Sequence, residues 1–395
     1  MSNESQLDLI VNSLAIGVGL IGLIGIWLHK RDDANATHRG PLTWLIFLLS
    51  AGCVFLVAQA ADVVPETSAV LVASLMTIVP IPALTWLYVV RLTSQTADSP
   101  RIKRKHWIMT IAYGVLILPL LAAPELALGA EPAEEVMIRV RVLVALLCFA
   151  LFLLLWFAHL ARVGFLTVRQ VRSYRKRLQD AVSDTEGLEL RWIDGLMIFI
   201  AGSILLFLID LGSAFILPEP LLGPIAEDFF SLGVVTGLVV FGLKQSTPRP
   251  VFESSVDLAS DDAETESGQA SYDRSSFSEQ DCRMLAFQLD ALMSSEKRWL
   301  DPFLDLKTLS RMVGSKPYYV TQALNTVCER NFYRYVNSWR VEEAARLLLE
   351  TNDNVLAISE LSGFNSKSTF NSTFRKEKGL TPSAYRKEKG ALVAA

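Results

Sequence analysis

The chain has 395 residues, enough for two or three domains; 51% are hydrophobic and only 20% are charged. The mean hydropathy of +0.34 is high for a water-soluble protein. Apolar residues concentrate before residue 245, so the chain has two unlike parts. The net charge of −4 combines the charges of both parts and therefore excludes no class of partner. The four cysteines are scattered and lack the CxxC spacing of metal sites. Two lie in apolar runs and two in the polar C-terminal part, which argues against a disulfide framework.

Seven apolar segments before residue 245 meet or approach the length of about 20 residues that a bilayer crossing needs. They are residues 7–28, 41–61, 69–90, 106–123, 136–160, 192–217 and 225–243. The first has no basic residues before it and no small-residue cleavage site after it, so we expect a retained span. Pro80 and Pro82 predict a kink in the third segment.

Basic residues gather in alternate loops of this half. Lys and Arg follow the first, third, fifth and seventh segments, whereas the loops "DVVPETS", "PELALGAEPAEE" and "PEPLLGP" contain neither. By the positive-inside rule, the N-terminus lies outside and the chain after residue 244 is cytoplasmic. The pattern predicts a multi-pass protein of a bacterial inner (cytoplasmic) membrane.

Ionisable residues inside spans are costly and therefore mark candidate functional sites. Arg139 and Arg141 lie in the fifth segment and Asp210 in the sixth. One interpretation is a structural ion pair between Arg141 and Asp210, and the other is an outward-opening ligand pocket with an arginine as anion anchor. The basic segment 162–181 has two interpretations. In one, it extends the fifth helix into the cytoplasm and contacts the C-terminal domain or anionic lipid; in the other, its basic residues only determine the topology.

No pattern in the sequence indicates an enzyme. The four histidines have no metal-ligand spacing, and P-loop, GxSxG and HExxH motifs are absent. We therefore predict neither catalysis nor a cofactor or metal. Residues 245–276 are acidic with few apolar positions, which predicts a disordered, flexible linker between a membrane domain, 1–244, and a C-terminal domain, 277–395.

From Phe277 onward, apolar residues recur at helical spacing. A helix is predicted over about 279–296, and a helix-turn-helix motif over about 303–328, in which Pro317 begins the second helix and Val320, Ala323 and Leu324 face inward. The residues expected to face outward, toward DNA, are Ser315, Lys316, Tyr318, Tyr319, Thr321, Gln322 and Asn325.

A long helix, "NFYRYVNSWRVEEAARLLLE", leads to a second copy of the motif over about 354–379. Phe370 and Phe374 lie one turn apart on its buried face, Gly379 suits a left-handed C-cap, and Pro382 begins a closing helix. Residues 363–390 contain seven Lys and Arg residues but only two Glu. Such an excess of positive charge is typical of segments that contact phosphates. The candidate DNA-binding residues here are Ser366, Lys367, Ser368, Asn371, Ser372, Arg375 and Lys376.

The runs "GFNSKSTFNSTFRKEKGLTPSAYR" and "NFYRYVNSWRVEEAARLLLE" resemble the AraC/XylS transcription regulators over about residues 280–388. The resemblance implies two rigidly joined helix-turn-helix subdomains that read successive major-groove segments of DNA. Glu329 stands where the family usually has Gly, so a non-glycine residue is expected at positive φ, at roughly 1 kcal/mol. Ser372 stands where a basic residue is common.

Base contact and phosphate contact stay open for individual side chains. Lys367 and Arg375 could donate to guanine or to phosphate, and Asn371, Gln322 and Asn325 could pair with adenine. For any one of these residues, the alternative is a solvated polar face.

The sequence thus predicts an all-α protein: a seven-transmembrane helix bundle, an acidic linker and an AraC-like double helix-turn-helix domain. Our leading hypothesis is a membrane-embedded one-component transcriptional regulator whose membrane domain senses a signal. The alternatives are a transporter-like protein with a regulatory tail, and a membrane domain that is only an anchor. The predicted partners are double-stranded promoter or operator DNA, the lipid bilayer, RNA polymerase, an unidentified small-molecule or membrane signal, and a second copy of the chain on DNA.

Overall fold

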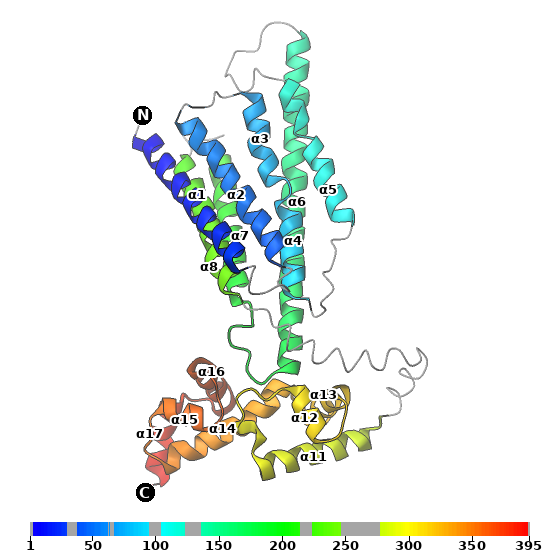
Figure 1. The fold of residues 1–395 in the computed structure, drawn as a ribbon, viewed down its shortest axis with the longest axis vertical. Helices are drawn as coiled ribbons and strands as arrows, with labels where there is room; N and C mark the ends of the chain where they lie inside the picture. The colour runs from blue at the N-terminus through cyan, green and yellow to red at the C-terminus, as the bar shows by residue number, and fades with distance from the viewer. Residues whose placement is uncertain are drawn as a thin grey trace. The chain divides into compact units, whose positions relative to one another are not determined.

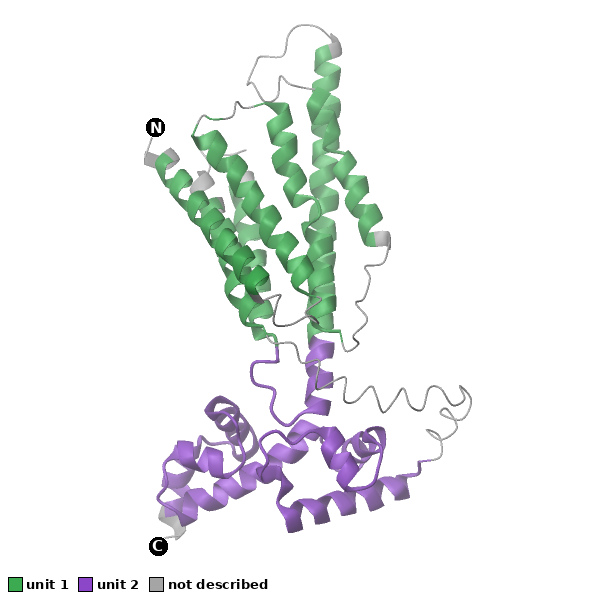
Figure 2. Cartoon of the chain, in the orientation of Figure 1, with its two compact units in different colours: residues 1–94, 98–171, 190–246 green, residues 95–97, 172–189, 247–395 purple. Residues whose placement is uncertain are grey.

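A computed structural model describes residues 3–29, 38–61, 63, 67–94, 104–122, 136–213, 223–245 and 277–393 (Figure 1). The regular structure of these residues is helical, with one isolated antiparallel bridge between Val182 and Asp305, which confirms the all-α class. The chain divides into two compact units (Figure 2): unit 1 is residues 1–94, 98–171 and 190–246, and unit 2 is residues 95–97, 172–189 and 247–395. The predicted linker lies outside the described residues, apart from Gln245.

Each of the seven predicted apolar segments contains helix in unit 1. The helices are α1 (Asn3–His29), α2 (Arg39–Ala60), α3 (Ser68–Ile78), α4 (Ile81–Leu92), α5 (Arg104–Val115), the 3-10 helix η1 (Leu118–Ala122), α6 (Val136–Ala181), α7 (Arg191–Ser213) and α8 (Gly223–Lys244). Among the described residues, five stretches are long and apolar enough to cross a membrane: Gln6–Leu28, Arg39–Ala60, Ser68–Leu92, Ile138–Ala181 and Arg191–Asp210. His106–Ala122 is a shorter apolar helix, so the number of spans stays a prediction.

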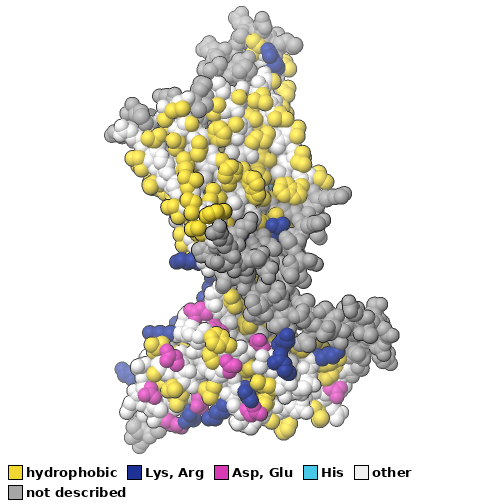
Figure 3. All heavy atoms as spheres, viewed as in Figure 1, with side chains coloured by type: hydrophobic (Ala, Val, Ile, Leu, Met, Phe, Trp, Pro, Cys, Tyr) yellow, Lys and Arg dark blue, Asp and Glu magenta, His cyan; other side chains and the backbone are white. Residues whose placement is uncertain are grey.

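Large apolar side chains cover the outside of unit 1. Ile21, Leu154, Phe165 and Ile198 are each more than half exposed, and yellow hydrophobic atoms dominate the visible face of this unit (Figure 3). A water-soluble protein rarely exposes apolar area on this scale. The exposed surface of unit 1 is therefore unlike that of a typical water-soluble protein.

The predicted proline kink is confirmed as a break between α3 and α4. Pro82 lacks the N–H that would donate to the carbonyl of Ile78 in a continuous helix. Trp156 of α6 donates to this carbonyl through Nε1 at 3.0 Å, and the Tyr113 hydroxyl donates to the carbonyl of Val79 at 2.9 Å. Side chains of neighbouring helices thus replace the lost backbone bonds, as a nonpolar environment requires.

Unit 2 holds the C-terminal helices together with residues 172–189. The helices are α11 (Glu279–Glu296), the 3-10 helix η3 (Arg298–Leu300), α12 (Leu306–Met312), α13 (Pro317–Thr326), α14 (Phe332–Glu350), α15 (Val355–Leu361), α16 (Lys367–Lys378) and α17 (Pro382–Val393). The predicted first helix, 279–296, has the bounds of α11. Local sequence sets the starts of four others, because the side chains of Asp305, Asn331, Asn354 and Ser366 each accept a backbone N–H of the first helical turn.

The long helix α14 belongs to two hydrophobic cores. Its first turns place Phe332, Tyr335 and Val336 in a core with α11, α12 and α13. Its later turns place Ala344 and Leu348, among others, in a core with α15 and α16. Because one continuous helix contributes to both cores, the two halves of unit 2 are joined without a flexible connection.

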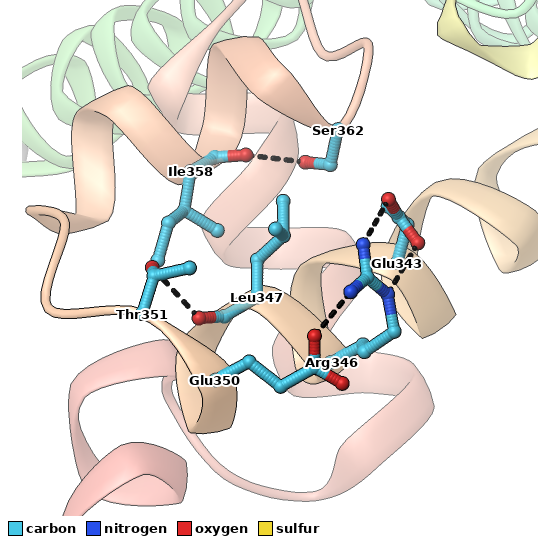
Figure 4. Close-up of polar contacts among 7 residues, drawn as sticks. All are labelled: Glu343, Arg346, Leu347, Glu350, Thr351, Ile358 and Ser362. Carbon is cyan, nitrogen blue, oxygen red and sulfur yellow. Dashed lines mark hydrogen bonds and ion pairs between the residues drawn. The ribbon is translucent and has the colours of Figure 1, made fainter.

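The C-terminal end of α14 is held by polar contacts (Figure 4). Arg346 donates to Glu343 at 2.7 Å and also pairs with Glu350. The hydroxyl of Thr351 donates to the carbonyl of Leu347 at 2.9 Å. Arg346 lies at the surface, where water screens ion pairs, so the apolar core rather than these pairs stabilises the helix end.

Candidate nucleic-acid interface

Two helix-turn-helix motifs in unit 2 have the same turn, 49 residues apart. In the first turn, between α12 and α13, the N–H of Ser315 donates to Ser310 O at 3.0 Å. In the second, between α15 and α16, the N–H of Phe364 donates to Ser359 O at 3.0 Å. Each turn contains a glycine at positive φ, Gly314 at 63° and Gly363 at 83°. The tight left-handed turn explains the glycine at both places.

The second helices of the two motifs bury equivalent positions, 50 residues apart. Val320, Ala323 and Leu324 are fully buried in α13, as predicted. The equivalent positions of α16 are Phe370, Thr373 and Phe374, of which both phenylalanines are fully buried, also as predicted. The offset grows by one because the second turn contains one more residue before its helix begins.

The positions on the other face of α13 are the first set of candidate DNA contacts. Lys316 is the N-cap residue and is exposed, as are Tyr318 and Asn325, whereas Ser315 and Thr321 are half-buried. Position by position, α16 presents Ser368 for Tyr318, Asn371 for Thr321, Ser372 for Gln322 and Arg375 for Asn325.

Two predicted outward residues of α13 lie partly in the protein. Tyr319 stacks on Phe277 with 4.3 Å between ring centroids and packs against the first core, so the prediction that it faces outward is corrected. The helical period alone cannot show this contact, because Phe277 precedes α11 by sequence. Gln322 is half-buried, and its buried Oε1 has no hydrogen-bond partner within the described residues.

The candidate residues of α16 are more exposed and more basic than those of α13. Lys367, Ser368, Ser372, Arg375 and Lys376 are exposed, and Asn371 is half-buried. Ser366 is the N-cap residue, and its Oγ accepts the N–H of Thr369 at 3.1 Å. Ser372 donates to the carbonyl of Thr369 at 3.0 Å, so its hydroxyl is partly occupied by its own helix.

Not every basic residue of this segment is available to a ligand. Lys378 donates to both carboxylate oxygens of Glu342 at 2.7 Å, which ties α16 to α14. Arg386 donates to the carbonyls of Leu348 at 3.0 Å and Asp353 at 2.6 Å, which caps the C-terminal end of α14. Because Lys378 and Arg386 are engaged within the protein, the count of basic residues in the sequence overestimates the positive charge that DNA could contact.

Comparison with known proteins agrees with this geometry. Residues 309–388 match the family described as "Helix-turn-helix domain". The chain is 31% identical over 83 residues to the uncharacterized HTH-type transcriptional regulator YobQ of Bacillus subtilis (strain 168), which is 21% of this chain and 34% of that protein. It is 30% identical over 87 residues to the melibiose operon regulatory protein of Escherichia coli (strain K12), which is 22% of this chain and 29% of that protein. The C-terminal domain is an AraC-type helix-turn-helix domain.

The family match covers residues 309–388, and each of these relatives covers about a fifth of the chain. The chain spans about a third of the length of the curated relatives it matches. A solved structure of a protein of unknown function from Listeria innocua is 31% identical, with 25% of this chain and 92% of that chain covered and a TM-score of 0.23.

The departure predicted at Glu329 is present in the AraC-type domain. Glu329 has a φ of 51°, between α13 and α14, in the left-handed region where a side chain costs roughly 1 kcal/mol. The N–H of the next residue, Arg330, donates to Leu324 O at 3.1 Å and closes the C-terminal end of α13.

The candidate residues of the apolar half lie on two helices. Arg139 and Arg141 are exposed on α6, and Asp210 is half-buried on α7, where its carbonyl accepts the hydroxyl of Ser213 at 2.7 Å. The pairing of Arg141 with Asp210 stays a prediction.

Sequence reasoning missed a buried polar cluster in unit 1. His106 Nδ1 and His159 Nε2 are 3.2 Å apart, and the other ring nitrogen of His159 is 3.2 Å from the Tyr113 hydroxyl. The two histidines are 53 residues apart on α5 and α6, so no local spacing indicated their contact. Within the described ranges, no group of three His, Cys, Asp or Glu side chains could hold a metal ion.

Proposed function

We propose that this protein is a membrane-embedded one-component transcriptional regulator. Its AraC-type domain binds double-stranded promoter DNA sequence-specifically, and its apolar half senses a signal that changes this binding. The observation that carries the proposal is the presence, among the described residues, of two equivalent helix-turn-helix motifs and five apolar helical stretches of spanning length.

DNA binding is supported by the chemistry of the two second helices. Arg375 and Lys367 are exposed donors that suit guanine edges or phosphates. The Oε1 of Gln322 is buried and has no donor within the described residues, so this side chain would have to rotate before it could pair with a base edge. Since α14 joins the two motifs rigidly, their helices would enter DNA at a set spacing.

Membrane embedding is supported by composition and exposure. The apolar exterior of unit 1 would be covered by lipid, and the proline break keeps its carbonyls paired as a bilayer demands. We infer that the bundle has two conformations and that the signal shifts the equilibrium between them. In a dimer on DNA, each conformation would place the two tethered DNA-binding domains differently.

The test uses the full chain in its native membrane. Promoter occupancy is mapped in cells that carry the full chain, and again in cells that carry residues 277–395 alone. We expect specific sites for the full chain and a loss of signal dependence for the tail. If promoter occupancy by the full chain is as independent of signal as that of residues 277–395, the apolar half is only an anchor, and substrate flux in proteoliposomes would favour a transporter. Absence of specific sites for both forms would contradict DNA-binding regulation.

Orientation is a separate experiment. Reporter fusions after residue 28 and after residue 244 each report on which side of the membrane that position lies. We expect both to report the cytoplasmic side, since the basic loops predict it. A fusion after residue 244 that reports the outer side would contradict the proposal, because DNA lies inside.

A further inference from the structure

Residues 179–189 pack on the AraC-type domain within unit 2. This segment, QDAVSDTEGLE, contains the last residues of α6 and the loop that follows it. Val182, Ser183 and Thr185 are buried there, and Val182 forms the backbone bridge with Asp305 at the start of α12. We call this segment the acidic strap, because it has four Asp and Glu residues and no Lys or Arg.

The centre of the contact is the side chain of Arg340 in α14, which is only 1% exposed. Its Nε donates to Trp299 O at 2.7 Å, and its Nη2 donates to Asp301 O at 2.6 Å and to the hydroxyl of Ser183 at 3.2 Å. One turn earlier in α14, Asn337 Nδ2 donates to the carbonyl of Ser183 at 2.9 Å. Ser183 thus completes the polar shell of a buried guanidinium.

The acidic strap also reaches both helix-turn-helix halves. The Ser183 hydroxyl donates to Leu304 O at 2.7 Å, just before α12. On the other side, Asn365 Nδ2 donates to Asp184 Oδ2 at 3.0 Å. Asn365 precedes Ser366, the N-cap of α16, and lies in the turn that is one residue longer than its counterpart. The strap therefore contacts the entry to the second candidate DNA-reading helix.

The negative charge of the acidic strap is expected to oppose DNA binding. The N-terminus of a helix favours anions, and in a DNA complex a phosphate would take that role. Here the Asp184 carboxylate lies beside the N-terminal end of α16. Burial lowers the pKa of Arg340 to about 10, and the charge of Asp184 works against that shift. The strap thus brings negative charge to a surface that a negative polymer would have to approach.

The strap is continuous with the apolar half. Helix α6 runs without interruption from Val136 to Ala181, and the strap begins within its last turn. A rotation or shift of this helix must therefore move residues 179–181 directly.

We propose that the acidic strap is an autoinhibitory element: docked on Arg340, Asn337 and Asn365 it weakens DNA binding, and movement of α6 releases it. The inference rests on the proposed DNA-binding function and assigns its regulation to one contact. It makes the AraC-type domain the partner of a segment of its own chain.

The experiment measures DNA affinity of the full chain in lipid nanodiscs, with a fluorescent pool of random-sequence duplex DNA of about 40 base pairs, a length that covers several helical turns. Ser183→Tyr is too large for its buried position, and Asp184→Ala removes the contact with Asn365. We expect each to bind about tenfold more tightly than the wild type, within the range of allosteric couplings. The matched control is Glu186→Ala, which removes the same charge from an exposed position two residues away and should change affinity less than about twofold.

Hydrogen exchange of residues 180–186 reports docking in the same samples. Exchange should accelerate in Ser183→Tyr, and in the wild type when DNA is added. Unchanged or weaker affinity in variants whose strap is released overturns the proposal, and so does slower exchange of the strap on DNA. If neither the wild type nor any variant binds DNA at low salt, the proposed function itself fails and the strap falls with it.

Discussion

The two helix-turn-helix motifs share a framework but differ in what they present. Both have a glycine turn at positive φ and bury three equivalent positions of the second helix. The first fills them with Val320, Ala323 and Leu324, and the second with Phe370, Thr373 and Phe374. On the opposite face, the first offers Lys316 with tyrosine and amide side chains, whereas the second offers three bases, Lys367, Arg375 and Lys376.

The difference shows that the buried and the outward positions of the second helices are under separate constraints. The turn and the buried positions must meet the geometry of helix packing, so they repeat. The outward positions meet only solvent or a ligand, so their chemistry diverges. We infer that the second motif holds phosphates while the first contributes mainly uncharged contacts.

The largest expected effect tests whether the two cores unfold separately. Phe374 is fully buried against Phe370 and Tyr385. Phe374→Ala should destabilise α16 by about 3–5 kcal/mol, from lost burial and a cavity. Native-state hydrogen exchange of the full chain should accelerate in α15 to α17 and much less in α11 to α13. Equal acceleration in both halves would mean that α14 makes them one cooperative unit.

The turn glycines should respond unequally to the same substitution. A Cβ on Gly363 would lie 2.6 Å from the carbonyl oxygen of Trp299, whereas one on Gly314 would meet open space. Gly363→Ala should cost about 3 kcal/mol, from left-handed strain and overpacking, and Gly314→Ala about 1 kcal/mol. Thermal inactivation of DNA binding, followed by anisotropy, ranks the two. Similar losses would show that the backbone near Trp299 relaxes.

Equivalent outward positions should separate charge from specificity. Arg375→Ala removes a cation and should weaken DNA binding about tenfold, with a salt slope smaller by about one. Asn325→Ala, at the equivalent position of α13, should change sequence preference by about 1–3 kcal/mol per base pair with an unchanged slope. Binding isotherms at several salt concentrations distinguish these outcomes. An unchanged slope for Arg375→Ala would place that side chain away from phosphate.

The smallest effect concerns a basic residue of the second motif that is already engaged. Lys378 pairs with Glu342, and the lysine side chain is 20% exposed while the glutamate is 70% exposed. Lys378→Gln should change stability by only about 0–1 kcal/mol and leave the salt slope nearly unaltered. Lys376→Gln serves as the exposed comparison and should reduce the slope. A large change in slope for Lys378 would mean that it leaves Glu342 on binding DNA.

Local pattern was sufficient for much of unit 2. Periodicity and helix starts predicted α11 to its bounds, the burial of Val320, Ala323 and Leu324 in α13, and that of Phe370 and Phe374 in α16. The resemblance to the AraC/XylS regulators, which usually have Gly there, predicted positive φ at Glu329. The helix bounds and buried faces depend on neighbours within one helical turn, and so the sequence displays them.

Contacts between distant segments could not be predicted in this way. Tyr319 stacks on Phe277, Lys378 pairs with Glu342, and His106 meets His159. In each case the partners belong to different elements, and helical period carries no information about which elements pack together. Our expectation of an outward Tyr319 was wrong for that reason.

The sequence by itself determined that this protein is helical and that its residues before 245 are apolar enough for a membrane, because hydrophobicity and helical period are local properties. The resemblance of two runs within residues 280–388 to the AraC/XylS regulators indicated the AraC-type domain. Only the tertiary structure decided which basic residues are free, which carbonyls the proline break leaves to other side chains, and that residues 179–189 pack on Arg340. Those outcomes depend on which surfaces meet when the chain folds, because burial and pairing are properties of the packed molecule.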